Sequence, residues 1–223
     1  MTRERQLWTW TLANALGLGV GFVAVLQVGM LIRFGLDTEL HWNPTPYGRG
    51  VRDYAQSLVG LLAGGAVLGS AQAFVVRSRA VRVVPWILST AAGFGLLVAV
   101  IWPLTALEIW GRIPGPVEPI AFTVGGGSLA AVLQYLSLRR QGIVASRWLA
   151  LWIGGLVASL VPTGLMFILI EGPLGLSVSW PLEVFLSGFV VAALAALISG
   201  RAFMAALSSS RPDRNVNPAT ART

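Results

Sequence analysis

Two stretches of the chain decide its fold: residues 64–93, GGAVLGSAQAFVVRSRAVRVVPWILSTAAG, and residues 126–155, GGSLAAVLQYLSLRRQGIVASRWLALWIGG. They are offset by 62 residues and share six identical positions: two adjacent glycines, then Gln, Arg, Trp and Gly. Glycine matches are common in apolar sequence, whereas matched Gln, Arg and Trp are not. The pattern therefore predicts an internal duplication whose unit contains two long apolar runs.

The same spacing extends to both ends of the chain. Downstream, Gly188 and Arg201 keep the step, but Ala196 stands where the glutamine would fall. Upstream, Trp10 and Gly17 match the repeated Trp and Gly at a step of 76 residues, and we place the 14 additional residues in an irregular outer loop. The sequence thus predicts three tandem two-helix repeats in a pseudo-threefold bundle, with hairpins at about 7–79, 85–140 and 148–206.

Composition places the chain in a membrane. It has 223 residues, of which 55% are hydrophobic and 11% are charged, whereas soluble domains carry about 25% charged residues. Six apolar segments are each long enough for the ~20 residues of a spanning helix: 7–34, 55–76, 85–107, 119–138, 148–170 and 181–206. We expect an all-α integral membrane protein with six transmembrane helices, forming a single domain over residues 1–206.

The basic residues predict the orientation. The formal charge of +7 comes from arginine alone, and twelve of the 16 arginines lie at the termini or after the second and fourth apolar segments. The other four are Arg33, Arg49, Arg52 and Arg112. The positive-inside rule then places both termini in the cytoplasm of a cell whose inner membrane holds the protein. We expect the lipid bilayer as partner, no nucleic acid, and a disordered cytoplasmic tail at 207–223.

The repeated residues have physical roles in such a bundle. Small residues at four-residue spacing predict close helix packing. Trp10, Trp86 and Trp148 begin odd-numbered segments, and we expect them to anchor these helices at the headgroup level. The inner-end arginines favour the negative end of the helix dipole, and they can alternatively form a ring that binds lipid headgroups or anions. These arginines are Arg77, Arg139 and Arg201.

Polar residues inside the apolar segments are candidates for function because they are costly in lipid. They are Asn14, Gln27, Gln72 and Gln134. One interpretation is interhelical hydrogen bonding, worth about 0.6–2 kcal/mol each, and the other is a polar path for a solute. We expect Gln72 and Gln134 to face the bundle interior.

Three charged residues at the outer ends of the odd-numbered segments suggest a cluster. Arg33 lies 23 residues after Trp10, and Glu108 and Glu171 lie at matching distances after the other repeated tryptophans. Carboxylates at helix carboxyl ends oppose the dipole. We hypothesise that Arg33, Glu108 and Glu171 meet and close the outer rim; the alternative is three separate hydrated charges.

The repeated motif resembles a known pattern. The residues that carry it are Gln72-Ala-Phe-Val-Val-Arg77 followed by Trp86, and Gln134-Tyr-Leu-Ser-Leu-Arg139-Arg140 followed by Trp148. The motif is similar to tandem Gln-Trp-Leu-Val-Leu-Arg-Arg repeats, followed by Ala and Trp, in uncharacterised bacterial multi-pass membrane proteins. Ala73 and Tyr135 replace the usual Trp. The resemblance covers the second to fifth apolar segments and implies the fold but no activity.

No motif indicates catalysis or a cofactor. The chain has no cysteine and one histidine, His41, so thiolate chemistry and multi-histidine metal sites are excluded. We therefore expect no cofactor, and a non-catalytic polytopic membrane protein that acts as an accessory or structural subunit of a membrane complex. The alternatives are a small pseudosymmetric transporter or channel for a small solute or lipid, and an enzyme acting on lipid through Glu108 or Glu171.

Overall fold

The structure, a computed structural model, describes residues 2–39, 46–77, 81–106, 117–171 and 180–209. These residues form helices and turns, and contain no strand. The helices are α1 (Arg3–Glu39), α2 (Pro46–Val76), α3 (Val83–Ala106), α4 (Val117–Arg140), α5 (Ser146–Ala158), α6 (Leu160–Glu171) and α7 (Trp180–Ser209). Five stretches are long and apolar enough to cross a membrane: those of α1, α2, α3, α7, and α5 with α6. The expected class, an all-helical chain suited to multiple membrane crossings, is confirmed.

Helix α4 is not among those five stretches, although the sequence suggested a span at 119–138. The helix holds three consecutive glycines, a glutamine and two terminal arginines, which lower its hydropathy. Its glutamine, Gln134, is only 2% exposed and therefore lies against other helices rather than against lipid.

The expected irregular loop at 37–53 is wrong for most of its length. Helix α1 continues to Glu39 and α2 begins at Pro46. Proline is favoured at the first position of a helix, because its φ angle is already helical and no amide hydrogen is needed there. The residues between the two helices, which include His41, lie outside the described part of the chain. The same is true of residues 210–223, which make up most of the expected tail.

The fifth apolar segment is interrupted rather than continuous. Helix α5 ends at Ala158 and α6 starts at Leu160, with Ser159 between them. Pro162 has no amide hydrogen for the carbonyl of Ala158, so one hydrogen bond of the helix is lost there. The Oγ1 of Thr163 donates to the carbonyl of Ser159 at 2.8 Å and bridges the break.

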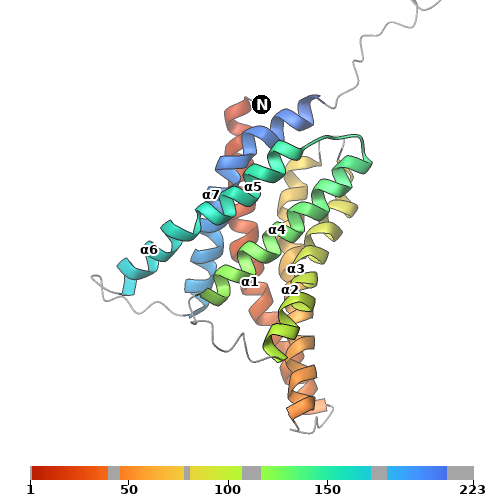
Figure 1. The fold of residues 1–223 in the computed structure, drawn as a ribbon, viewed down its shortest axis with the longest axis vertical. Coiled ribbons are helices and arrows are strands. Elements are labelled where there is room, and N and C mark those ends of the chain that lie inside the picture. The colour runs from red at the N-terminus through yellow and green to blue at the C-terminus, as the bar shows by residue number, and fades with distance from the viewer. Residues whose placement is uncertain (1, 40–45, 78–80, 107–116, 172–179, 210–223) are drawn as a thin grey trace, which may run out of the picture.

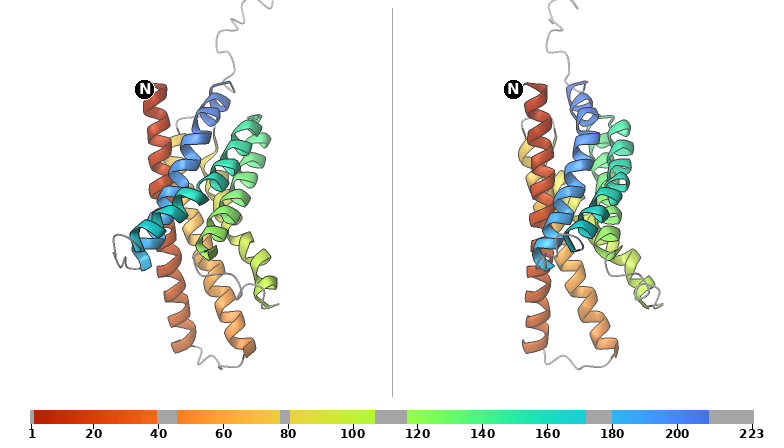
Figure 2. Two further views of the ribbon diagram at one scale, coloured as in Figure 1. Left: turned by 60° about the vertical axis from the view of Figure 1, so that its left-hand side comes forward. Right: turned by 90° about the vertical axis from the view of Figure 1, so that its left-hand side faces the viewer.

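The helices pack in a closed order around one core. Each of α1, α2 and α3 contacts its successor, α4 contacts α5, α5 contacts α7, and α7 contacts α1. Figure 1 shows the amino terminus at the same end of the molecule as the last turns of α2, α4 and α7. At the opposite end, α1 and α2 extend beyond the other helices (Figure 2).

The repeated glycines lie where the two helices of one hairpin touch. A Cβ on Gly93 would lie 2.3 Å from the Cα of Ala130, and one on Gly155 would lie 2.8 Å from the Cα of Ala195. A Cβ on Gly17 would lie 2.9 Å from the Cβ of Ala71. These contacts agree with the predicted close packing, since no larger side chain fits without moving a neighbouring helix.

Candidate functional site

A network of buried polar side chains joins α1, α2, α3 and α4. Gln72 is its centre: its Nε2 donates to the Oδ1 of Asn14 at 2.6 Å. Its Oε1 accepts from the Nε1 of Trp86 at 3.1 Å and from the Nε2 of Gln134 at 2.7 Å. The Nε2 of Gln134 also donates to the Oγ1 of Thr90 at 2.7 Å. We call these five residues the polar network.

The ends of the polar network are tied to the backbone. The Nδ2 of Asn14 donates to the carbonyl of Trp10 at 2.8 Å, and the Oγ1 of Thr90 donates to the carbonyl of Trp86 at 2.9 Å. Gln72 and Gln134 are 1% and 2% exposed, which agrees with the expectation that both face the bundle interior. Because these donors and acceptors pair with one another, the polar groups are stabilised inside an apolar surrounding.

Four aromatic rings pack together next to the polar network. The ring centroids of Trp10 and Trp86 are 6.4 Å apart, and those of Trp86 and Trp148 are 6.1 Å apart. Phe203 lies against all three, at 4.4 Å from Trp10, 5.6 Å from Trp86 and 5.1 Å from Trp148. All four side chains are fully buried. We call this group the aromatic cluster.

The aromatic cluster corrects the expectation that the repeated tryptophans anchor the helices at the lipid interface. The repeat places one tryptophan near the same end of each hairpin, and here all three point inward, so they meet. The period fixes their height along the helices but not the face on which they lie. Trp8, two residues before Trp10 and 52% exposed, is the tryptophan of α1 that faces outward.

The third hairpin, α5 to α7, contributes no side chain to the polar network as defined above. Ala196 stands where Gln72 and Gln134 stand in the other hairpins. Trp152 occupies the place four residues after the repeated tryptophan, which Asn14 and Thr90 hold elsewhere. Its Nε1 instead donates to the carbonyl of Gly127 at 3.4 Å. An apolar residue and a bulky ring therefore replace two polar residues in this sector.

This replacement explains an unpaired donor. The Nε1 of Trp86 has Gln72 as acceptor, whereas the Nε1 of Trp10 is buried without a hydrogen-bond partner among the described residues. A Cβ on Gly200 would lie 3.6 Å from the Nε1 of Trp10, so the indole faces α7, one turn from Ala196. In the same part of the chain, Thr11 Oγ1 and Trp148 Nε1 are likewise buried without a partner.

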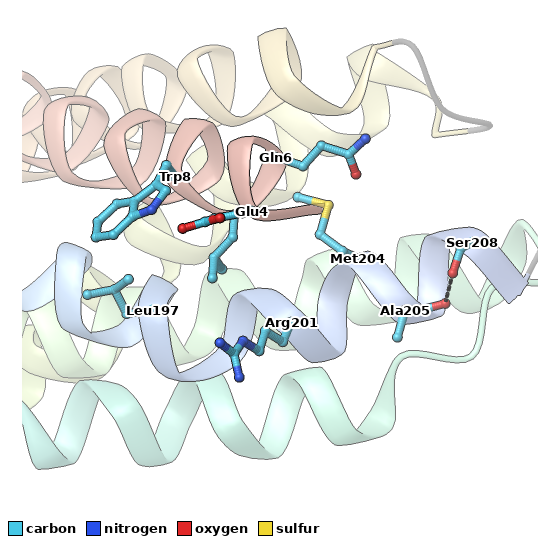
Figure 3. A pocket seen from close by; sticks show the side chains of 9 residues that line it. Glu4, Gln6, Trp8, Leu197, Arg201, Met204, Ala205 and Ser208 are labelled. Carbon is cyan, nitrogen blue, oxygen red and sulfur yellow. Dashed lines mark hydrogen bonds between the residues drawn. The ribbon is translucent and has the colours of Figure 1, made fainter. Parts of the chain in front are cut away.

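The three repeated arginines are exposed. Arg77 follows α2 with its guanidinium 4.2 Å above the ring of Phe74, Arg139 is in the last turn of α4, and Arg201 lies within α7. Arg201 lines a groove between α7 and α1 that also contains Glu4 (Figure 3). Joint binding of lipid headgroups or anions by the three arginines stays a prediction.

The remaining candidate residues are not brought together in the described part of the chain. Gln27 is exposed on α1, and it lies 13 residues, or about 20 Å, along the helix from Asn14, so it is outside the polar network. Arg33 is exposed on the same helix. Glu108 and the side chain of Glu171 lie outside the described residues, so the outer charge cluster stays a hypothesis.

Sequence reasoning found the amides but missed Thr90, Phe203 and Trp152. A signal was present for two of them, because each follows a repeated tryptophan by four residues, as Asn14 follows Trp10. Phe203 has no counterpart in the repeat, and nothing in its local sequence indicated that it fills the centre of the bundle. Over the described ranges, no group of His, Asp or Glu side chains is arranged to hold a metal ion.

No family model, curated protein or solved structure matches the chain. The resemblance to bacterial multi-pass proteins with tandem Gln-Trp-Leu-Val-Leu-Arg-Arg repeats therefore stays a prediction. Function is inferred from the polar network, the aromatic cluster and the surface of the bundle.

Proposed function

We propose that the chain is a non-catalytic polytopic membrane protein that serves as an accessory or structural subunit of a complex in the cell (inner) membrane. One observation carries this proposal. The polar side chains within α1 to α4 hydrogen-bond one another, and the aromatic cluster beside them is fully buried. A solute site needs polar groups that are accessible and free to bind, whereas these are already paired and covered.

The architecture that we propose for this subunit is a pseudo-threefold bundle of three tandem hairpins. Gly17, Gly93 and Gly155 support it, because each contacts a small residue of the second helix of its own hairpin. The meeting of Trp10, Trp86 and Trp148 in one cluster supports it further. Equivalent residues then make equivalent contacts in the three units.

We further propose that both termini are cytoplasmic. The arginine distribution supports this orientation, and the chain offers a direct test because it has no cysteine. A single cysteine at exposed Ser208 should be protected from a membrane-impermeant maleimide in intact cells. A single cysteine at Gly35, near the other end of the bundle, should be labelled. The reverse labelling pattern would contradict the orientation.

The accessory role is tested by gentle purification from native membranes, followed by identification of co-purifying proteins. A partner present in fixed stoichiometry through two different detergents supports the role. The matched control is a chain with Gln72→Leu, which should lose the partner together with the folded bundle, while Gln27→Leu should keep both. A chain that purifies alone from every mild detergent and from native nanodiscs would contradict the role.

The alternative is a small pseudosymmetric transporter or channel for a solute or lipid. Three buried polar atoms without a partner in the described part of the chain favour it, namely Trp10 Nε1, Thr11 Oγ1 and Trp148 Nε1, since they offer binding capacity beside the polar network. A transporter should move small polar solutes across reconstituted vesicles, with flux lost in Gln72→Leu and kept in Gln27→Leu. Equal leakage in protein-free vesicles would exclude it.

A further inference from the structure

The first turns of α1 and the last turns of α7 enclose a groove of about 870 Å³. Its walls combine Glu4, Leu7 and Trp8 from α1 with Leu197, Arg201 and Met204 from α7 (Figure 3). This volume is within the ~300–1,000 Å³ of small-molecule sites. The groove opens at the surface, because Glu4, Trp8 and Arg201 are all exposed.

The groove carries one group of each charge sign, and the two groups point in different directions. In Figure 3 the Glu4 carboxylate lies between the two helices beside Trp8, while the Arg201 guanidinium points away from α1. The apolar side chains of Leu7, Leu197 and Met204 complete the lining. A ligand that satisfies this site must present an anion, a cation and an apolar part close together.

The groove lies at a membrane-interface position. The apolar stretches of α1 and α7 run over Glu4–Gly35 and Phe185–Ser209, so both end at the groove. A helix that crosses the bilayer places its end at the headgroups. Trp8 is 52% exposed there, as expected for a tryptophan at the level of the glycerol and headgroups.

We propose that this groove is a binding site for a phospholipid whose headgroup contains both a phosphate and a primary ammonium, that is, an ethanolamine phospholipid. The Arg201 guanidinium donates hydrogen bonds to the phosphate oxygens, a geometry that suits its planar group. The Glu4 carboxylate accepts from the ammonium. Leu7, Leu197 and Met204 contact the upper part of an acyl chain.

The charges select this class over other phospholipids. A glycerol headgroup offers the phosphate but leaves Glu4 without a cation. A choline headgroup offers a cation, but its trimethylated nitrogen has no hydrogen to donate. The proposal requires that α1 and α7 cross a bilayer, and it is independent of the accessory role, since the lipid contacts this chain alone.

Native mass spectrometry of the full chain provides the test. The protein is mixed with equimolar ethanolamine, glycerol and choline phospholipids that have the same acyl chains, and the retained lipids are counted. We expect an excess of ethanolamine lipid of about tenfold, the factor that one charge-assisted hydrogen bond gives. Equal retention of the three headgroups would overturn the proposal.

Variants separate the two contacts. Arg201→Gln should lower retention of all three lipids, while Glu4→Gln should abolish only the preference for ethanolamine. Arg139→Gln is the matched control, since Arg139 is exposed at the equivalent repeat position but does not line the groove. If Arg139→Gln lowers retention as much as Arg201→Gln, the binding is a general property of basic surface and the proposal is overturned. Thermal stability measured alongside should be unchanged, because all three residues are exposed.

Discussion

The first two hairpins and the third hairpin are held together by different forces. Helices α1 to α4 share a chain of side-chain hydrogen bonds centred on Gln72. Helices α5 and α7 are instead joined by small-residue contact at Gly155 and by rings, with Phe203 at 5.1 Å from Trp148. Related sequences thus build one sector that depends on hydrogen-bond geometry and another that depends on shape.

A repeat can therefore keep its scaffold while its interior diverges. The repeated glycines and tryptophans, which set helix spacing and height, persist in all three units. The glutamine persists only in two, because its partners lie on α1 to α4. Replacing it by Ala196 removes a polar group whose burial without a partner would cost about 1–3 kcal/mol.

The largest effect is expected from Gln72→Leu. This change removes the partner of Asn14, Trp86 and Gln134 at once and leaves buried donors and acceptors unpaired. We predict a loss of roughly 2–4 kcal/mol in the free energy of unfolding, measured by denaturation in mixed micelles. Gln27→Leu, on the exposed face of α1, should change it little. Equal losses in both variants would show that the polar network does not stabilise α1 to α4.

The next effect concerns the glycine contacts that both sectors share. Gly93→Ala and Gly155→Ala each place a Cβ against the backbone of the facing helix. We predict that each lowers the free energy of unfolding by about 1–3 kcal/mol. A Cβ on the adjacent Gly154 would have no described atom within 4 Å, so Gly154→Ala is the control. If the third hairpin tolerates Gly155→Ala as well as Gly154→Ala, its packing does not depend on shape.

The junction between the two sectors is the turn after α4. Gly142 has φ 79°, and its N–H donates to the carbonyl of Arg139 at 3.0 Å. A side chain is strained in this left-handed conformation, so Gly142→Ala should cost about 1 kcal/mol. The free energy of unfolding should fall without a change in ethanolamine-lipid retention. If retention falls as well, the junction is coupled to the groove between α1 and α7.

The smallest effect separates paired from unpaired indoles. Trp86→Phe and Trp10→Phe remove the same volume from the aromatic cluster, but of these two only the Nε1 of Trp86 has a hydrogen-bond acceptor among the described residues. Trp86→Phe should therefore lower the free energy of unfolding by about 0.6–1.5 kcal/mol more than Trp10→Phe. Identical values would mean that the Trp86–Gln72 bond adds no net stability.

Sequence reasoning reached some elements and not others. The helical segments were predicted to within a few residues for α3, α4 and α7, since apolar runs bounded by charges leave little choice. The start of α2 at Pro46 and the break at Ser159 were not predicted, because both depend on local backbone pairing within apolar or mixed sequence. Gln72 and Gln134 were identified because a buried amide in an apolar run is costly unless it is paired.

The helical class, the multiple apolar helices and the height of each repeated residue follow from the amino-acid sequence, because length, hydropathy and period are properties of one chain segment at a time. Three facts emerge only when the helices pack: the tryptophans face inward, Gln72 meets Asn14, Trp86 and Gln134, and Glu4 and Arg201 share a groove. All three depend on the rotation of each helix about its axis. That rotation is fixed by how glycine contacts bring neighbouring helices together, and no single segment encodes it.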